Sequence, residues 1–77
     1  MAIETVGRYQ LHLFAYELPA PGGWDAFLSI YRFSDEAQDF LCVIEKHRVS
    51  EQPYETYDTA IEAARRTGNA MIDTGRI

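Results

Sequence analysis

Residues 24–33 read Trp-Asp-Ala-Phe-Leu-Ser-Ile-Tyr-Arg-Phe, and this stretch decides the fold. In an extended chain successive side chains point to opposite faces, so Leu28 and Ile30 share one face and Phe27, Tyr31 and Phe33 share the other. The stretch is rich in strand-forming residues, and both of its faces are apolar. It therefore predicts a strand inside a sheet, with two faces that each need a covering layer.

Turn-forming residues bound this stretch on both sides. Residues 19–23 read Pro-Ala-Pro-Gly-Gly, in which prolines remove backbone donors and glycines permit left-handed conformations. Residues 34–38 read Ser-Asp-Glu-Ala-Gln, a polar break short enough to reverse the chain. The runs beyond these breaks, Tyr9–Leu18 and Asp39–Arg48, are also strand-like. Together the three runs predict an antiparallel meander.

The hydrophobic period changes after the polar segment 49–55, and it indicates a helix from Thr56 to about Thr74. Thr56 or Asp58 can cap its start, and Gly75 can end it. Gly68 lies in the apolar stripe, which predicts a close approach of the helix backbone to the sheet. The stripe consists of Tyr57, Ile61, Ala64, Gly68, Met71 and Ile72.

The predicted fold is a single α+β domain over residues 1–77, a three-stranded antiparallel meander with one C-terminal helix on one face. A register with Leu13 opposite Ile30 and Tyr31 opposite Leu41 puts like faces together. Under this register the face toward the helix carries Leu11, Leu13, Ala15, Leu28, Ile30, Phe40, Cys42 and Ile44. The other face carries His12, Phe14, Tyr16, Phe27, Ser29, Tyr31, Phe33, Leu41 and Val43.

The aromatic face is the candidate interaction surface, because one helix can cover only one side of the sheet. Three interpretations remain open: cover by loops or by the N-terminal segment, self-association, or a platform for a ligand or nucleic acid. Uncovered apolar patches of several hundred Å² are unusual on monomers, which favours self-association. The candidate residues are Phe14, Tyr16, Phe27, Tyr31 and Phe33.

Composition restricts the class of protein. The chain has 77 residues, 47% of them hydrophobic, and a net charge of −5, so it is too apolar for a disordered tail. It has no apolar run long enough for a membrane span and no basic start followed by an apolar stretch, so we expect a cytoplasmic protein. The negative charge repels phosphate backbones and makes nucleic acid an unlikely partner.

No motif for a metal, a cofactor or catalysis stands out, so we expect none of the three. The predicted register projects His12 and Cys42 from opposite faces, where they cannot share a metal ion. Cys42 is interpreted as a small buried side chain. The acidic clusters 35–39 and 51–55 fit solvated turns. Lys46, His47 and Arg48, with Arg65 and Arg66, form at most a modest basic patch, and Glu62 and Arg66 are spaced for a helical ion pair.

The order of elements, with Tyr54-Glu55-Thr56-Tyr57-Asp58 before the helix and Ile72-Asp73-Thr74-Gly75 after it, resembles small uncharacterised bacterial proteins. It also looks like the partial ribonuclease-H-like module of HicB antitoxins, although this chain has no appended DNA-binding region. We expect a non-enzymatic interaction module, most simply a homodimer. The alternatives are an acidic antitoxin-like partner of a small basic protein, and a single-stranded nucleic-acid binder that uses the aromatic face.

Overall fold

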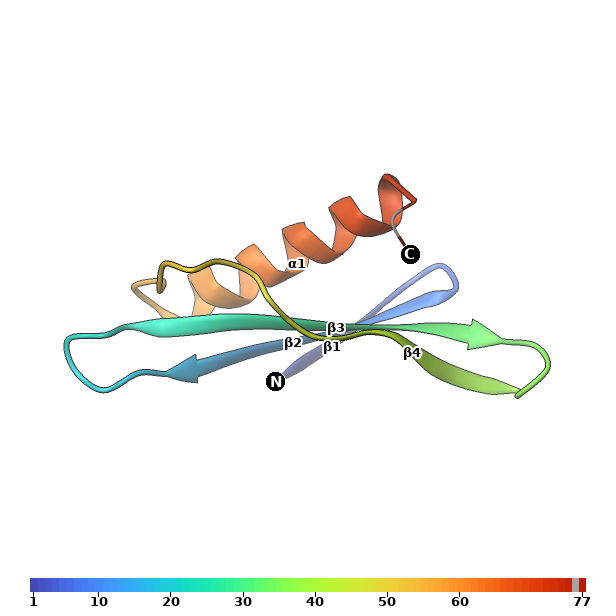
Figure 1. Cartoon of the computed structure of the whole chain (residues 1–77), viewed down its shortest axis with the longest axis horizontal. Helices are drawn as coiled ribbons and strands as arrows, with labels where there is room; N and C mark the ends of the chain where they lie inside the picture. Colours follow the sequence, from blue (N-terminus) through green and yellow to red (C-terminus); the bar gives the residue numbers. More distant parts are fainter. Residues whose placement is uncertain (76) are drawn as a thin grey trace.

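A computed structural model describes residues 1–75 and 77 of the chain. Four strands form one antiparallel sheet in chain order: β1 (Ala2–Val6), β2 (Tyr9–Glu17), β3 (Trp24–Ser34) and β4 (Asp39–Arg48). Helix α1 (Tyr57–Asp73) follows and lies across one face of the sheet (Figure 1). The predicted antiparallel α+β fold with a single C-terminal helix is confirmed, but the sheet has four strands and not three.

The additional strand, β1, pairs with β2 at the edge of the sheet. Its five residues alternate between half-buried and exposed, as expected for an edge strand with one face toward the core. Gly7 and Arg8 connect it to β2, and Gly7 has a φ of 59°, which glycine adopts without steric cost. The strand is short, and its apolar residues Ile3 and Val6 lie on opposite faces, so its sequence shows no alternating pattern. Because of it, the N-terminal segment widens the sheet and does not fold over a face.

Between β2 and β3 the predicted faces are right, although the register differs by two residues. Leu13 lies opposite Leu28, and Leu11 lies opposite Ile30. The strands continue until Glu17 pairs with Trp24, so the loop is only six residues long. The N–H of Leu18 closes that loop by donating to the carbonyl of Gly23 at 2.8 Å. A shift of two residues leaves every side chain on its own face.

Between β3 and β4 the predicted register is wrong in a way that exchanges faces. Tyr31 lies opposite Cys42 and Phe33 opposite Phe40, which puts Cys42 and Phe40 on the face away from α1. Leu41 consequently moves to the helix side, opposite Arg32. Further along the two strands, irregularities shift the register twice, so that Ile30 lies opposite Ile44 and Leu28 lies opposite His47. Such β-bulges insert extra residues into one strand and leave no clear mark in the sequence.

The start and end of α1 follow the predicted pattern. Thr56 is the N-cap: its side chain accepts from the N–H of Thr59, and the Thr59 hydroxyl accepts from the N–H of Thr56. Both contacts satisfy donors that a helix start leaves without partners. Gly75 follows the helix with a φ of 70°, as expected for a residue that ends a helix.

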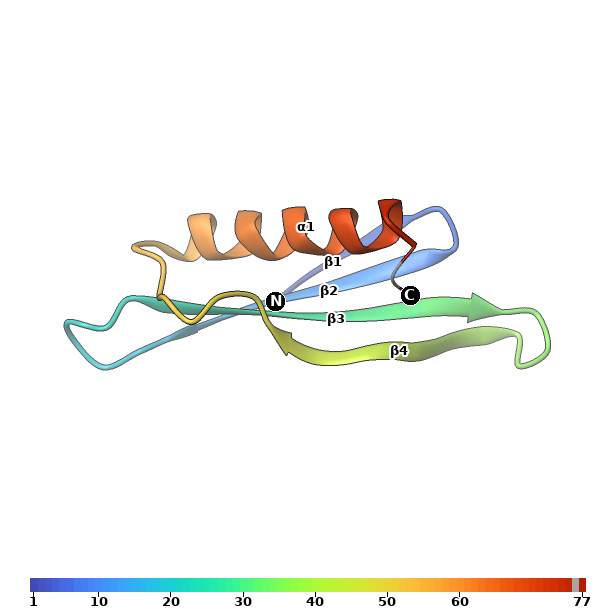
Figure 2. The same ribbon diagram turned by 45° about the horizontal axis from the view of Figure 1, so that its top comes forward.

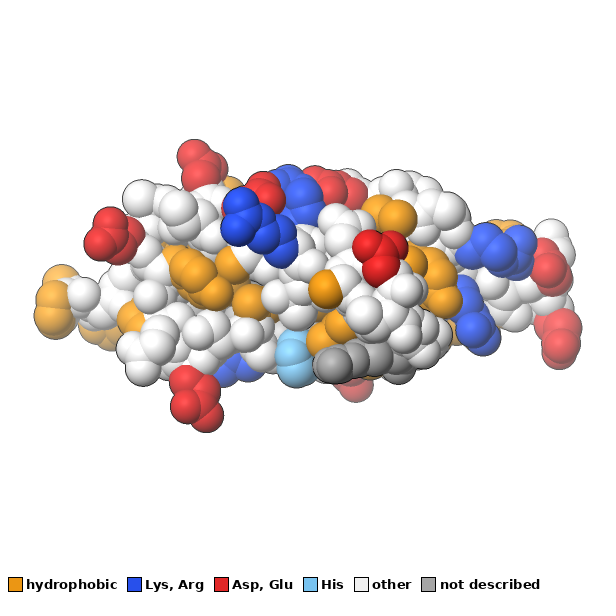
Figure 3. Space-filling model, turned by 90° about the horizontal axis from the view of Figure 1, so that it is seen from above, with side chains coloured by type: hydrophobic (Ala, Val, Ile, Leu, Met, Phe, Trp, Pro, Cys, Tyr) orange, Lys and Arg blue, Asp and Glu red, His pale blue; other side chains and the backbone are white. Residues whose placement is uncertain are grey.

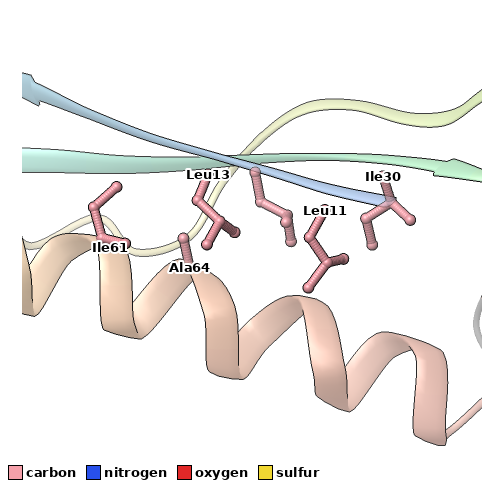
Figure 4. Packing of buried hydrophobic residues seen from close by; sticks show 6 residues of the cluster. Leu11, Leu13, Ile30, Ile61 and Ala64 are labelled. Atoms are coloured by element: carbon pink, nitrogen blue, oxygen red, sulfur yellow. The ribbon is translucent and has the colours of Figure 1, made fainter. Parts of the chain in front are cut away.

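The core lies between α1 and the two central strands. Leu11, Leu13, Leu28 and Ile30 are completely buried, and Ile61 and Ala64 meet them from the helix. Figure 4 shows the labelled side chains of sheet and helix pointing toward one another. A Cβ placed at Gly68 would lie 3.0 Å from a methyl carbon of Leu11 and 3.1 Å from one of Leu28. The predicted close approach at this glycine is therefore confirmed.

Candidate interaction surface

The open face is the side of the sheet away from α1, and all five candidate residues lie on it. Phe14 and Tyr16 come from β2, and Phe27, Tyr31 and Phe33 come from β3. The helix packs on Leu11, Leu13, Leu28 and Ile30, whose side chains leave the same strands in the opposite direction. Figure 1 shows no element of the described chain beneath the sheet.

The aromatic rings of the open face contact one another laterally. Phe14 and Tyr16 stack with centroids 6.1 Å apart, and Tyr16 meets Phe27 edge-on at 5.6 Å. Phe33 meets Phe40 of β4 edge-on at 5.4 Å, which adds a sixth ring that the sequence had assigned to the core. These distances are in the favourable range for aromatic pairs. The face therefore carries aromatic rings from three strands, in one group around Tyr16 and a second group of Phe33 with Phe40.

Lateral packing also limits how much of each ring reaches solvent. Tyr16 is 42% exposed, whereas Phe14, Phe27, Tyr31 and Phe33 are half-buried. Neighbouring rings therefore already cover part of the apolar area of each aromatic side chain. A second layer would bury the remaining apolar area of each ring.

Lys46 is a member of the open face that the sequence did not indicate. It lies in the irregular part of β4 with a φ of 29°, and its N–H donates to the Ser29 hydroxyl at 3.0 Å. Its Nζ atom lies 5.0 Å from the ring centroid of Phe14 and 4.9 Å from that of Tyr16. Both contacts are cation–π interactions. Lys46 shares the open face with Phe40 and Cys42, and the predicted register, which put that set of β4 residues on the helix side, could not place it there.

His12 is another titratable group of the open face. Its Nε2 lies 2.8 Å from Oε1 of Gln10, and its ring centroid lies 4.4 Å from that of Tyr31. Partial burial lowers the pKa of His12, because the imidazolium loses hydration there. The ring is therefore held mainly in its neutral form near pH 7.

Cys42 does not occupy the buried position predicted for it. Its side chain is exposed and shares the open face with His12, so the prediction of opposite faces is wrong. The cause is the pairing next to the β3–β4 turn, where Tyr31 lies opposite Cys42 and not opposite Leu41 as predicted. In residues 1–75 and 77, no group of three or more His, Cys, Asp or Glu side chains is arranged to hold a metal ion.

The acidic clusters take part in turns. Asp35 forms an ion pair with Arg8 at 3.1 Å, and Asp39 accepts from the N–H of Phe40 at 2.8 Å. Glu51 and Glu55 are exposed in the segment before α1. This is the solvated arrangement that their loop positions predict.

The basic residues do not form one patch. Arg65 joins α1 to the sheet edge: its NH2 nitrogen lies 2.6 Å from a carboxylate oxygen of Glu4, and it also pairs with Glu62. The predicted ion pair between Arg66 and Glu62 is confirmed at 3.3 Å. Hydrogen bonds from Arg65 lower the pKa of Glu4. Figure 3 shows this mixture of opposite charges on the helix side.

A second hollow surface, which we call the β4 groove, was not predicted from the sequence. It lies on the helix side and has a volume of about 840 Å³. It forms because α1 packs on β2 and β3 and leaves β4 uncovered (Figure 2). The residues that define it are Val6, Tyr9, Arg32, Leu41, Val43 and Ile72.

Comparison with known proteins gives no match among family models, curated proteins or solved structures. In the part of the chain that the structure describes, no helix is long and apolar enough to cross a membrane.

Proposed function

We propose that this protein is a non-enzymatic self-association module that forms a homodimer through its open face. The observation that carries the proposal is an aromatic layer over three strands, opposite a face that α1 already covers. Aromatic residues are enriched at interfaces because they bury large apolar areas with few rotatable bonds. Two such sheets can stack about 10 Å apart, as in a β-sandwich.

The size of the open face is just above the lower limit for a specific interface. A strand of nine residues spans about 30 Å, and four strands side by side span about 19 Å. The projected area is then about 570 Å² per copy, or about 1,100 Å² for two copies, which exceeds the roughly 1,000 Å² expected of a specific interface. Side-chain relief increases the true contact area further.

The titratable groups on this face have structural partners. Lys46 contacts two aromatic rings and His12 contacts Gln10, while Asp25 forms an ion pair with Arg48 at 3.0 Å. A catalytic site needs a nucleophile or base aimed into a cleft, with a third group that orients it. The arrangement of the open face supports association better than catalysis.

Light scattering during size exclusion tests the proposal. The wild-type protein is expected to elute at twice the mass of the 8.8 kDa chain at tens of micromolar. Tyr31→Glu places a carboxylate in the aromatic layer and is expected to give a monomer, because burying an unpaired charge is unfavourable. Tyr16→Glu removes a ring and places a carboxylate beside Lys46; it is also expected to give a monomer, because desolvating an ion pair costs more than burying the ring that it replaces. Ala70→Glu adds the same charge at an exposed position of α1 and is expected to remain dimeric. Circular dichroism confirms that each variant is folded.

A wild-type monomer, unchanged by the two tyrosine substitutions, would contradict self-association. Equal loss of the dimer in Ala70→Glu would show that net charge, and not the open face, controls assembly.

A second candidate function is binding of single-stranded nucleic acid on the same face. The observation that favours it is Lys46, which adds a cation to rings that can stack on bases. Titration of a labelled single strand at low salt is then expected to show binding that weakens as salt rises and that Lys46→Met reduces. A dimeric protein with no change in the signal of the labelled strand would exclude this candidate.

A further inference from the structure

The β4 groove exposes apolar side chains on the side of the sheet that the helix was expected to protect. Leu41 is 50% exposed and Val43 is 38% exposed. Ile72 of α1 and Tyr9 of β2 pack against the edge of the core and form the opposite wall. From the helix side, Figure 3 shows an apolar patch toward the end where α1 terminates, with basic side chains next to it. The groove and the open face lie largely on opposite sides of the sheet and adjoin near the β3–β4 turn, where Phe33 and Cys42 also line the groove.

The size of the groove fits a small molecule. Its volume of about 840 Å³ is within the range of about 300–1,000 Å³ found for small-molecule sites. The β1–β2 and β3–β4 turns lie side by side at the same end of the sheet, where Arg8 pairs with Asp35, and they bound the groove at that end (Figure 2). A protein interface of standard size needs a larger surface. The dimensions therefore favour a compact, mainly apolar ligand.

Arg32 supplies the polar end of the site. It lies between Tyr9 and Leu41 in the register, and its side chain is exposed at the groove. Arg8, the other arginine at the groove, is already paired with Asp35 at 3.1 Å. Within residues 1–75 and 77, no carboxylate lies within ion-pair distance of Arg32. A guanidinium group matches a carboxylate with two parallel hydrogen bonds.

We propose that the β4 groove binds a small amphipathic carboxylate. The hydrocarbon lies against Leu41, Val43 and Ile72, and the carboxylate pairs with Arg32. Glu36 also lines the groove, and its negative charge disfavours ligands with more than one negative charge. The site depends only on the helix side of one copy, so it is independent of whether the open face forms a dimer.

Titration with decanoate, followed by methyl NMR, tests this site. Decanoate is expected to shift the methyl signals of Leu41, Val43 and Ile72, with little effect on the ring signals of Phe14, Tyr16 and Phe27, which do not line the groove. Decanol, which lacks the charge, is expected to bind about tenfold more weakly, in line with the loss of a charge-assisted hydrogen bond. Arg32→Gln is expected to weaken decanoate binding by the same factor and to leave decanol binding unchanged.

Arg48→Gln is the matched control, because Arg48 is a half-exposed arginine on the opposite side of the sheet. It is expected to leave decanoate binding unchanged. Four results would each overturn the proposal: no methyl shifts at millimolar decanoate, equal affinity for decanoate and decanol, no effect of Arg32→Gln, or shifts confined to the open face. Groove signals that move with protein concentration and not with decanoate would assign the groove to an interface between copies. Repeating the titration with monomeric Tyr16→Glu separates failure of this site from failure of the proposed dimer.

Discussion

Substitution of Gly68 by alanine is expected to destabilise the protein, although alanine is the better helix former. On helix propensity alone, Gly68→Ala would stabilise α1 by about 1 kcal/mol. The new Cβ would, however, lie 3.0 and 3.1 Å from two methyl carbons of Leu11 and 3.1 Å from a methyl carbon of Leu28. Favourable carbon–carbon contacts lie at about 3.5–4.0 Å, so three contacts are too short by about half an ångström.

The two leucines have little room to move, because both are completely buried between α1 and the sheet. Extra atoms in a well-packed core typically cost about 1–3 kcal/mol. This cost exceeds the gain in helix propensity, and the expected net loss is about 1 kcal/mol of unfolding free energy. For a domain of this size that loss lowers Tm by about 4–8 °C.

Urea denaturation followed by circular dichroism at fixed protein concentration measures the effect. The control is Ala70→Gly, two residues further along α1 at an exposed position, which is expected to lose about 1 kcal/mol through helix propensity alone. If Gly68→Ala instead raises the midpoint by an amount equal and opposite to the control, the close approach of helix and sheet does not restrict this position. The argument from packing would then be refuted.

Three further predictions concern the N-cap of α1 and two titratable side chains. Thr56→Ala removes the N-cap acceptor and is expected to cost about 1 kcal/mol, measured by the same denaturation, whereas Thr56→Ser is expected to retain most of the stability. Burial lowers the pKa of His12 in the folded protein below the unfolded pKa of about 6.5. The stability that neutral His12 contributes is therefore fully present above pH 6.5 and is lost as the pH falls through the lower folded pKa. Melting curves of His12→Gln are expected to lose this pH dependence. Arg65 lowers the pKa of Glu4, so the stability from this pair is present above pH 4.5 and is lost as the pH falls through the lowered folded pKa. The stability of Glu4→Gln is expected to depend less on acid pH than that of the wild type. The difference in stability between Glu4→Gln and the wild type is expected to shrink at high salt, which screens the ion pair.

The sequence predicted those parts of the fold that depend on local patterns. The alternation in residues 24–33 and the turn residues on both sides identified the meander, and the helical stripe identified α1 with its N-cap at Thr56. Gly68 was informative because a glycine inside an apolar stripe is costly unless two backbones meet there. These features are encoded within a few residues of one another.

The parts that could not be predicted depend on pairing between strands. Ser34 pairs with Asp39 next to the β3–β4 turn, one residue away from the predicted register, and this puts Phe40 and Cys42 on the open face and Leu41 on the helix side. Both faces of β4 carry apolar residues, so the residues alone do not indicate which register forms. The β4 groove was missed because Leu41 was expected on the opposite face. The five candidate residues kept their common face, because the β2–β3 register slipped by an even number of residues.

The most direct test of the central claim is an isotope-filtered NOE experiment on a mixture of labelled and unlabelled copies. Such an experiment detects only protons that are close to each other across two different chains. The proposed dimer predicts intermolecular NOEs among ring protons of Phe27, Tyr31 and Phe33, and none from α1. No intermolecular NOEs at a concentration where light scattering gives the mass of a dimer, or NOEs that involve α1 instead of the open face, would contradict it.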